Sequence, residues 1–434
     1  MTMIGIRIED KYLMEKRVAI TPNFVKELIE QHNIEFEVES SPKRVFTDEE
    51  YMKAGAKIVD RIKDSNIIFG VKEMPSEFFE EKKTYLFFSH TIKGQDYNMD
   101  LLRKMVEKKI NLIEFEKITD DNGKRLIFFG RFAGLAGMIN SFWSFGQRCK
   151  VLGYETPFSS LQQSYLYSSI EDAISALSQV AKEIKLHGLP AELAPLTIGI
   201  TGNGNVSKGA QEIINLFENK EITPSGLLDL KRNGNYDSKT IYKIIFNEND
   251  LSVPLDSEAE FELQHYYKHP EEYKNDFERY VPEISILMNC MFWSPDFPRI
   301  ITKDFLKELF KNQNSKLCVI GDVTCDPDGS IEATHIGTYI EDPVFVYNPE
   351  NQDSTMGFEG DGVLIMAVDI LPAELPRESS LAFSKALSEF IPALAKTNFE
   401  LDFDELNIPM PFKRALILHQ GEFTPDYEYM KAFL

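Results

Sequence analysis

Short apolar runs and helix-spaced apolar positions alternate along most of this chain. The clearest unit starts at residues 196–200, a mostly apolar run typical of a buried parallel strand. Beyond a turn that contains Gly202 and Gly204, apolar residues return at helical spacing as far as Phe217. The pattern predicts a strand, a tight turn and a helix in direct succession.

The same alternation predicts further elements on both sides of this unit. Strands are expected at residues 4–8, 36–38, 67–71, 85–88, 112–115, 284–288, 316–320 and 363–368, and helices at residues 23–32, 47–54 and 168–186. Strands that alternate with helices form parallel sheets, so the predicted fold class is α/β. The charged, aromatic segment 219–280 interrupts the alternation, and we interpret it as an insertion.

The glycine turn is a candidate dinucleotide site. A strand followed by G-x-G and a helix lets the backbone approach a pyrophosphate, which the helix N-terminus stabilises. Gly202 would permit the turn and Gly204 the close approach, and Asn205 and Val206 follow them. Ser207 stands where a third glycine is usual, so an ordinary strand–helix turn is the alternative.

Titratable side chains follow three of the predicted N-terminal strands. They are Lys72 and Glu73, His90, and Glu116. The carboxyl ends of parallel strands meet at one edge of a sheet, where ligands bind, so we expect these groups to converge. Histidine titrates near neutrality, and burial lowers the pKa of a lysine, so His90 and Lys72 are the acid–base candidates. A backbone-satisfied histidine and a solvated lysine are the alternatives.

Three arginines near glycine-rich or strand-end positions are candidates for binding carboxylates. They are Arg17, Arg125 and Arg131. A guanidinium group is planar, always charged and bidentate, so it matches a dicarboxylate, although surface arginines are common without any ligand.

Composition and charge narrow the classes of partner. A net charge of −22, from 47 basic and 69 acidic residues, argues against nucleic acid and anionic membranes and leaves small-molecule substrates. No apolar run is long enough to span a bilayer, the N-terminus has no signal core, and the four cysteines lack CxxC spacing. We therefore expect a cytoplasmic protein, with a homo-oligomer left open.

The spacing of Asp326 and Asp328 suggests a calcium-binding loop, but other ligand positions of such a loop hold the wrong residue types. Thr324 occupies the first ligand position and His335 the position of the closing glutamate, so no metal is expected.

Longer segments indicate a family. The chain resembles the alanine dehydrogenase/saccharopine dehydrogenase superfamily in IRIEDKYLMEKRVAITPNFVKELI, IIFGVKEMP, FFSHTIKGQ, FFGRFAGLAGM, TGNGNVSKGAQ and VDILPAELPRE. Within it, the chain is most similar to the lysine–2-oxoglutarate reductase part of bifunctional α-aminoadipic semialdehyde synthases in HTIKGQ, LIEFEKITD, TPFSS, YYKHPEEY, NCMFWSPDFPRIIT and GSIEATHIGTYIEDP. The resemblance spans essentially the whole chain. It leaves out the second enzyme of those proteins, so a separate saccharopine-oxidising enzyme, or none, is expected to take the product onward.

The resemblance implies two Rossmann-like domains with parallel sheets separated by a cleft. Residues 1–135 and about 374–434 would form the substrate and catalytic domain. Residues 136–373 would form the dinucleotide-binding domain, with the insertion at about 219–280.

The resemblance also implies roles for individual residues. Lys72 and His90 match the acid–base pair of the family, and Glu73 and Glu116 match carboxylates that modulate this pair or help to bind substrate. Among the arginines, Arg17 and Arg125 match carboxylate-binding positions, whereas Arg131 has no equally firm role. On the cofactor side, Asp369 matches a residue near the nicotinamide, and Asp322, at the end of an earlier strand, joins the cofactor-binding set.

The implied reaction condenses L-lysine with 2-oxoglutarate and reduces the imine to saccharopine, as in lysine degradation. NADPH is the expected cofactor, because the reductases that the chain resembles prefer it. Residues 223–225 also lack the acid that NAD enzymes carry about twenty residues after the first glycine. Glu221 lies near that distance, so NAD stays open. The alternatives are an NAD-dependent, lysine-forming saccharopine dehydrogenase, a related amino-acid/keto-acid reductase, and a non-catalytic dinucleotide-binding regulatory protein.

Overall fold

The chain divides into two compact units. The structure is a computed structural model that describes residues 2–312 and 315–434. Unit 1 is Met1–Phe129 with Pro376–Leu434, and unit 2 is Gly130–Leu375. The predicted boundaries near residues 135 and 373 lie a few residues away, because α4 (Gly130–Val151) is one continuous helix and α11 (Pro376–Ser388) starts at a proline.

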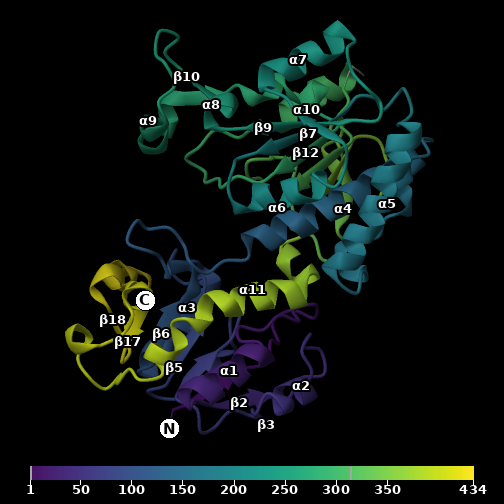
Figure 1. Cartoon of the computed structure of the whole chain (residues 1–434). Coiled ribbons are helices and arrows are strands. Elements are labelled where there is room, and N and C mark those ends of the chain that lie inside the picture. Colours follow the sequence, from purple (N-terminus) through teal and green to yellow (C-terminus); the bar gives the residue numbers. More distant parts are fainter. Residues whose placement is uncertain (1, 313–314) are drawn as a thin grey trace. The chain divides into compact units, whose positions relative to one another are not determined.

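Each unit is built on an eight-stranded, largely parallel sheet, which confirms the predicted α/β class (Figure 1). No helix among the described residues is both long enough and apolar enough to cross a lipid bilayer.

The sheet of unit 1 has the order β18-β17-β6-β5-β4-β1-β2-β3. Strands β1 to β6 are parallel to one another, and β17 and β18 add an antiparallel edge. The strands are β1 (Met3–Ile6), β2 (Glu35–Glu39), β3 (Lys57–Val59), β4 (Ile67–Phe69), β5 (Thr84–Phe87), β6 (Asn111–Glu114), β17 (Leu416–His419) and β18 (Glu422–Phe423). Consequently, β1, β4, β5 and β6 bring their carboxyl ends to the same edge.

Helices cover both faces of this sheet. The helices of unit 1 are α1 (Pro22–His32), α2 (Asp48–Lys53), α3 (Asp96–Glu107), α11, α12 (Ile391–Leu394) and α13 (Met410–Arg414). One apolar core holds Val25 of α1 and Phe383 of α11, and a second core holds Leu102 of α3. Thr21 and Pro22 start α1 as predicted, because a proline at the first helical position loses no hydrogen bond.

The sheet of unit 2 has the order β15-β14-β16-β13-β12-β7-β9-β8, with β14 and β15 antiparallel. Its strands are β7 (Leu196–Thr201), β8 (Asn219–Glu221), β9 (Ile241–Phe246), β12 (Ile286–Asn289), β13 (Val319–Asp322), β14 (Val344–Asn348), β15 (Asp353–Met356) and β16 (Val363–Met366). Helices α4 and α6 (Asn205–Ile214) lie on one face of the sheet, and α7 (Pro224–Asn233) and α10 (Lys303–Lys311) lie on the other (Figure 1). Helix α5 (Ile170–His187) precedes β7.

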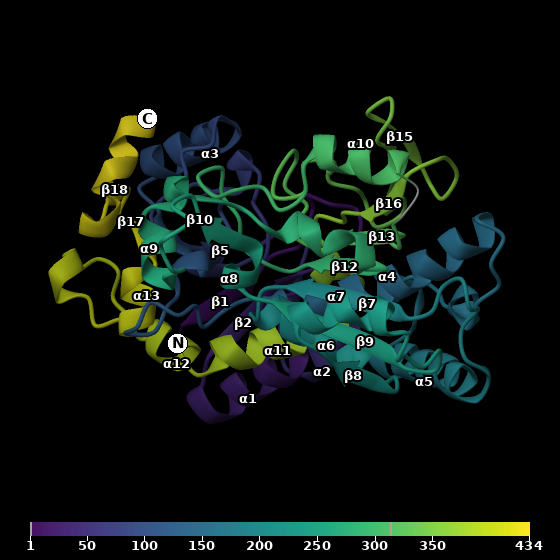
Figure 2. The same ribbon diagram turned by 90° about the horizontal axis from the view of Figure 1, so that it is seen from above.

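The prediction that residues 219–280 form one insertion is wrong in its first half. Strands β8 and β9 belong to the main sheet: β9 pairs with β7, and β8 pairs with β9 at the sheet edge (Figure 2). The chain leaves the sheet only after β9, through α8 (Glu248–Leu251), α9 (Leu263–Lys268) and the antiparallel pair β10 (Ser252–Pro254) and β11 (Tyr273–Asn275). The hydrophobic pattern did not indicate these strands, because β8 is a short polar edge strand and Lys243 interrupts the apolar run of β9.

Two glycines bring the backbones of α4 and α6 into contact. A Cβ atom at Gly134 would lie 1.9 Å from the carbonyl oxygen of Val206, and a Cβ atom at Gly209 would lie 2.1 Å from that of Arg131. Helix α6 is the helix that follows the glycine turn, so this packing fixes its position against α4.

We expect Gly134→Ala to lower the free energy of unfolding by about 1–3 kcal/mol or more, because its methyl group collides with rigid backbone. Gly130→Ala in the same helix is the matched control, since its Cβ would meet no atom closer than 3.5 Å. Urea denaturation of both variants measures the difference. Equal stabilities would contradict the close packing of the two helices.

Candidate active site

The predicted site residues of unit 1 gather at the carboxyl edge of its sheet. Strand β4 leads to Lys72 and Glu73, β5 leads to Ser89 and His90, and β6 ends at Glu114. The segment after β1 reaches the same edge, because Val71 and Lys72 donate their backbone N–H groups to the carboxylate of Glu9 at 2.6 and 2.9 Å.

Glu73 is the centre of an ion-pair chain. Its Oε1 atom accepts hydrogen bonds from Nδ1 of His90 at 2.7 Å and from Nζ of Lys11 at 2.6 Å. His90 adopts a left-handed backbone conformation with φ of 51°, which is uncommon for a residue with a side chain and is found at functional sites. Its ring stacks on Phe88 and its side chain stays 28% exposed, so the imidazole is oriented yet accessible.

The carboxyl group of Glu73 is held as an anion. Burial alone would raise its pKa, but the hydrogen bond and charge of His90 and the hydrogen bond of Lys11 lower the pKa to about 2. A carboxylate only accepts hydrogen bonds, so Nδ1 of His90 carries the proton in this pair. The second oxygen of Glu73 is buried and has no hydrogen-bond partner among the described residues.

Lys72 lies close to this chain. Its side chain is half-buried, with Nζ 5.7 Å from the centre of the Tyr12 ring, and the Nζ of Lys11 lies 5.1 Å from the same ring. The charge of Lys72 also contributes to the low pKa of Glu15, which places the two groups near each other. The structure therefore brings Glu73 and His90 into contact and places the Lys72 side chain at the same strand end, beside Tyr12 and Glu15.

Arg17 is buried rather than open to solvent. It donates from Nε and Nη2 to the two carboxylate oxygens of Glu15 at 2.8 and 2.6 Å, and its guanidinium group lies over the Phe129 ring at 4.2 Å. Burial would raise the pKa of Glu15, and the charge of Arg17 lowers it below its usual range. Glu15 takes one N–H group each from Nε and Nη2, so a ligand carboxylate could use Nη1 and the second N–H group of Nη2 without displacing Glu15.

Arg125 and Glu116 form a looser pair in unit 1. Their Nη1 and Oε1 atoms are 3.9 Å apart, and the side chain of Arg125 is 42% exposed. Glu114, which precedes them, is buried; burial raises its pKa, and Ser89 donates to it at 2.5 Å from Oγ. Arg125 is thus the more accessible of the two arginines.

The sequence reasoning missed Glu9, Lys11 and Glu15. Burial, aided by the charge of Glu15, raises the pKa of Glu9 to about 7. All three follow the first predicted strand, so the strand-end rule that pointed to Lys72 and His90 could have found them.

Unit 2 holds the glycine turn as predicted. Gly202 has φ of 78°, which only glycine adopts readily, and its N–H donates to the carbonyl oxygen of Phe246 at 2.8 Å. Gly204 caps α6, which begins at Asn205, and a Cβ atom at Gly204 would meet no protein atom within 4 Å. Protein packing therefore leaves room for a side chain at position 204. A side chain there would obstruct a pyrophosphate that approaches the helix N-terminus, so a bound pyrophosphate would require the glycine.

Neighbouring residues of the turn have structural partners. Ser207 is buried and its Oγ accepts a hydrogen bond from Gln211 at 3.1 Å, while the carbonyl group of Val206 faces Gly134. Ser207 thus fills the packing position of the third glycine and contributes no free side chain to a ligand.

Three other predicted residues of unit 2 differ in their surroundings. Asp322 is buried, and its carboxylate accepts hydrogen bonds from Asn289, Thr324 and Thr334, so it fixes the loop after β13 and is not free to bind a cofactor. Arg131 forms a bidentate pair with Glu212 at 2.7 and 2.6 Å, which links α4 to α6. Asp369 follows β16, is exposed, and accepts a weak hydrogen bond from the Cys325 thiol at 3.9 Å.

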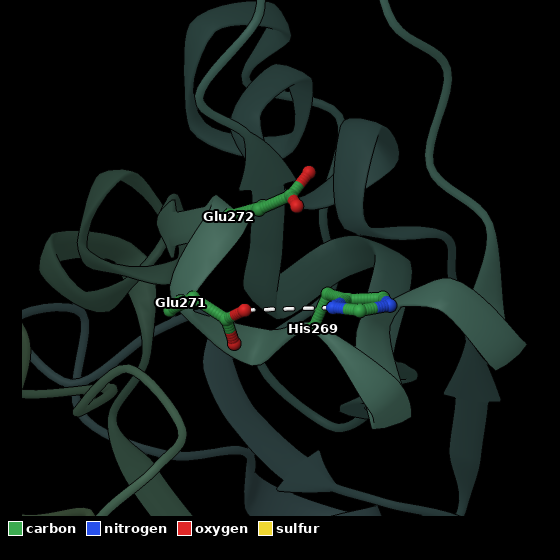
Figure 3. A group of neighbouring side chains, drawn as sticks. All are labelled: His269, Glu271 and Glu272. Carbon is green, nitrogen blue, oxygen red and sulfur yellow. Dashed lines mark ion pairs between the residues drawn. The ribbon is translucent and has the colours of Figure 1, made fainter.

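One group in the described part of the chain has metal-ligand geometry. His269, Glu271 and Glu272 place ligand atoms within 4.8 Å of one another, and Figure 3 shows the carboxylate of Glu271 turned towards His269. All three side chains are exposed and lie far along the chain from the groups above, so we assign no metal to them.

Comparison with known proteins identifies relatives over the full chain. Residues 5–136 match the family model described as "Alanine dehydrogenase/PNT, N-terminal domain". An alpha-aminoadipic semialdehyde synthase from Arabidopsis thaliana is 38% identical over 99% of this chain and 41% of its own length. A saccharopine dehydrogenase [NAD(+), L-lysine-forming] from Yarrowia lipolytica is 26% identical over 88% of this chain and 90% of its own length.

The chain spans less than half the length of the first curated relatives that it matches. Among solved structures, an L-alanine dehydrogenase superposes with a TM-score of 0.62 and 17% identity, covering 99% of both chains. That likeness supports the two-sheet α/β fold alone.

The ion-pair chain around Glu73 predicts a pH-dependent contribution to stability. The pKa of Glu73 falls from an ordinary 4.5 to about 2 on folding, so the stabilisation is complete above about pH 5 and is lost as the pH falls towards 2. We expect the stability advantage of the unmodified chain over Glu73→Gln to shrink by about 2 kcal/mol between pH 6 and pH 3. Urea denaturation at the two pH values measures it, and a constant difference would contradict the assignment.

Proposed function

We propose that this chain, which belongs to the alanine dehydrogenase/saccharopine dehydrogenase superfamily, is an oxidoreductase that joins L-lysine to 2-oxoglutarate and reduces the imine to saccharopine. One observation carries the proposal: the Lys11–Glu73–His90 chain lies beside Lys72 at the ligand-binding edge of a parallel sheet. Reductive condensation needs two proton-transfer groups at one place, and this edge supplies them.

His90 is proposed as the group that moves protons to and from the substrates. Glu73 is an anion that holds a proton of His90 on Nδ1, so Nε2 is the nitrogen of the ring that can exchange a proton with a substrate. It can take a proton from the ε-ammonium group of lysine, which makes the amine nucleophilic, and later return one as the carbinolamine loses water. Lys72 is proposed as the second proton-handling group, and its charge contributes to the low pKa of the neighbouring Glu15.

Arginines are proposed to hold the substrate carboxylates. Arg125 is half-exposed and only weakly paired with Glu116, so it can rotate towards a carboxylate at little cost. Arg17 would contribute Nη1 and the second N–H group of Nη2, while Glu15 holds the guanidinium group in place through Nε and Nη2. The unpartnered oxygen of Glu73 is a suitable acceptor for the substrate ammonium.

The proposed hydride donor is a nicotinamide dinucleotide, which when bound supplies a hydride to the imine carbon. Gly202, Gly204 and the N-terminus of α6 would hold its pyrophosphate, and Asp369 remains the candidate near the nicotinamide. Arg131 and Asp322 are left out of the proposal because their polar groups are already paired. NADPH was the cofactor expected from the resembled reductases and from the acid-free residues 223–225.

The first test measures oxidation of the reduced cofactor in the presence of lysine and 2-oxoglutarate. The loss of nicotinamide absorbance at about 340 nm follows the reaction. We expect His90→Gln and Lys72→Met each to lower kcat by about 100-fold or more, as is typical for acid–base groups. His32→Gln and Lys93→Met are matched controls on exposed positions of the same unit. Near-normal turnover of a site variant would remove that residue from the mechanism, and equal rates with ornithine or alanine would point to a different amino substrate.

A second prediction concerns the glycine turn. Gly204→Ala places a methyl group where a pyrophosphate would lie, so we expect the affinity for the reduced cofactor to fall by about 10-fold or more. The backbone of Gly204 is extended and its Cβ position is open, so the free energy of unfolding should change by no more than about 1 kcal/mol. Fluorescence titration with the cofactor and urea denaturation separate the two effects; unchanged affinity would contradict pyrophosphate binding at this turn.

A further inference from the structure

The strand order of unit 2 changes which acidic residue stands next to the glycine turn. In the common dinucleotide fold the second strand pairs with the first, and an acid at its end binds the ribose hydroxyls. Here the second strand of the unit, β8, lies at the edge, and β9 pairs with β7 instead. Each strand adds about 4.8 Å, so the end of β8 lies roughly 10 Å from β7.

Glu221 is the acid that is found by counting about twenty residues from Gly202. It ends the edge strand β8 and therefore lies one strand too far from the glycine turn. Its carboxylate pairs with Lys243 of β9 at 3.0 Å, so its charge is already compensated. The position that corresponds in space to the ribose-binding acid is the end of β9.

Glu248 occupies that position. Strand β9 ends at Phe246, whose carbonyl oxygen accepts the N–H of Gly202 at 2.8 Å, and Glu248 follows two residues later. A cavity of about 390 Å³ is lined by Gly202, Asn203 and Gly204 on one side and by Glu248 on another. The hydroxyl group of Tyr267 donates to Oε1 of Glu248 at 2.8 Å and holds the carboxylate in the cavity wall.

The rest of the cavity suits a nucleoside. Its remaining lining is Leu251, Tyr266, Tyr267, Cys290, Met291, Phe292 and Phe297. Tyr267 and Phe292 of this lining are 48% and 77% exposed, so aromatic surface is available for a base. The volume falls within the roughly 300–1,000 Å³ of small-molecule sites.

Charge then decides between the two forms of the cofactor. Among the described residues that line the cavity, Glu248 is the only charged one, and no arginine or lysine is present. A carboxylate accepts hydrogen bonds from the 2′- and 3′-hydroxyl groups of an unphosphorylated ribose. It repels a 2′-phosphate, which needs a cation that this lining does not supply.

We infer that Glu248, placed at the glycine turn by the β8-β9-β7 strand order, selects NAD(H) over NADP(H). The inference rests on the proposed function only in that it takes this turn as the dinucleotide site. It replaces the expectation of NADPH, which was based on the preference of the resembled reductases and on the acid-free segment after the edge strand.

The test is the dissociation constant of the full chain for NADH and for NADPH, measured by fluorescence titration without substrates. We expect NADH to bind at least about 10-fold more tightly, as the loss of a hydrogen bond to a charged group implies. Glu248→Gln should weaken NADH binding by about 10-fold and narrow the preference, and Glu248→Arg should reverse it. Glu221→Gln is the matched control and should leave both constants within about twofold, because it lies one strand away.

A second variant tests the inference even if the charge changes at position 248 disturb folding. Tyr267→Phe leaves the carboxylate in place and removes only the hydroxyl group that holds it, so NADH binding should weaken a few-fold with its preference retained. Tighter binding of NADPH by the unmodified chain, or a shift of preference in Glu221→Gln rather than in the Glu248 variants, would overturn the inference. NADH binding without turnover of lysine and 2-oxoglutarate would overturn the proposed reaction and leave the inference standing, and a failure to bind either nucleotide would overturn both.

Discussion

The buried carboxylate of Glu73 is the interaction on which the candidate active site depends. One of its oxygens holds both Nδ1 of His90 and Nζ of Lys11, and these contacts keep the group ionised despite its burial. The consequence is chemical as well as structural, because the anion fixes the tautomer of the imidazole. The parallel pairing of β4 with β5 makes this possible, since it sets the residues after the two strands side by side.

Much of the fold and part of the site could be predicted from the sequence. Long apolar runs such as residues 196–200, and strong helix starts such as Thr21-Pro22, gave strands and helices at the correct places. The convergence of Lys72, Glu73 and His90 followed from a single rule about parallel strand ends. Charged residues in the turn after β1 were passed over, although the same rule applies to them.

Other features were out of reach because the sequence does not specify pairing partners. Strand β8 is three polar residues at an exposed edge, so nothing in its pattern distinguishes it from a loop. Without β8 and β9 in their places, a count of residues from the first glycine leads to Glu221 rather than to Glu248. Likewise, Asp322 stands at a strand end as a ligand-binding residue would, and only the contacts with Asn289, Thr324 and Thr334 reveal that it is already satisfied.

The left-handed backbone of His90 carries a consequence for how this protein tolerates change. A side chain in that conformation raises the free energy of the folded state by about 1 kcal/mol or more, and glycine would relieve it. Relief of this strain is opposed by the loss of the ion pair, because a glycine at position 90 would leave the buried carboxylate of Glu73 without its imidazole partner. The imidazole–carboxylate pair therefore offsets the backbone strain at position 90, and a smaller residue there would lose the contact that holds the strained conformation in place.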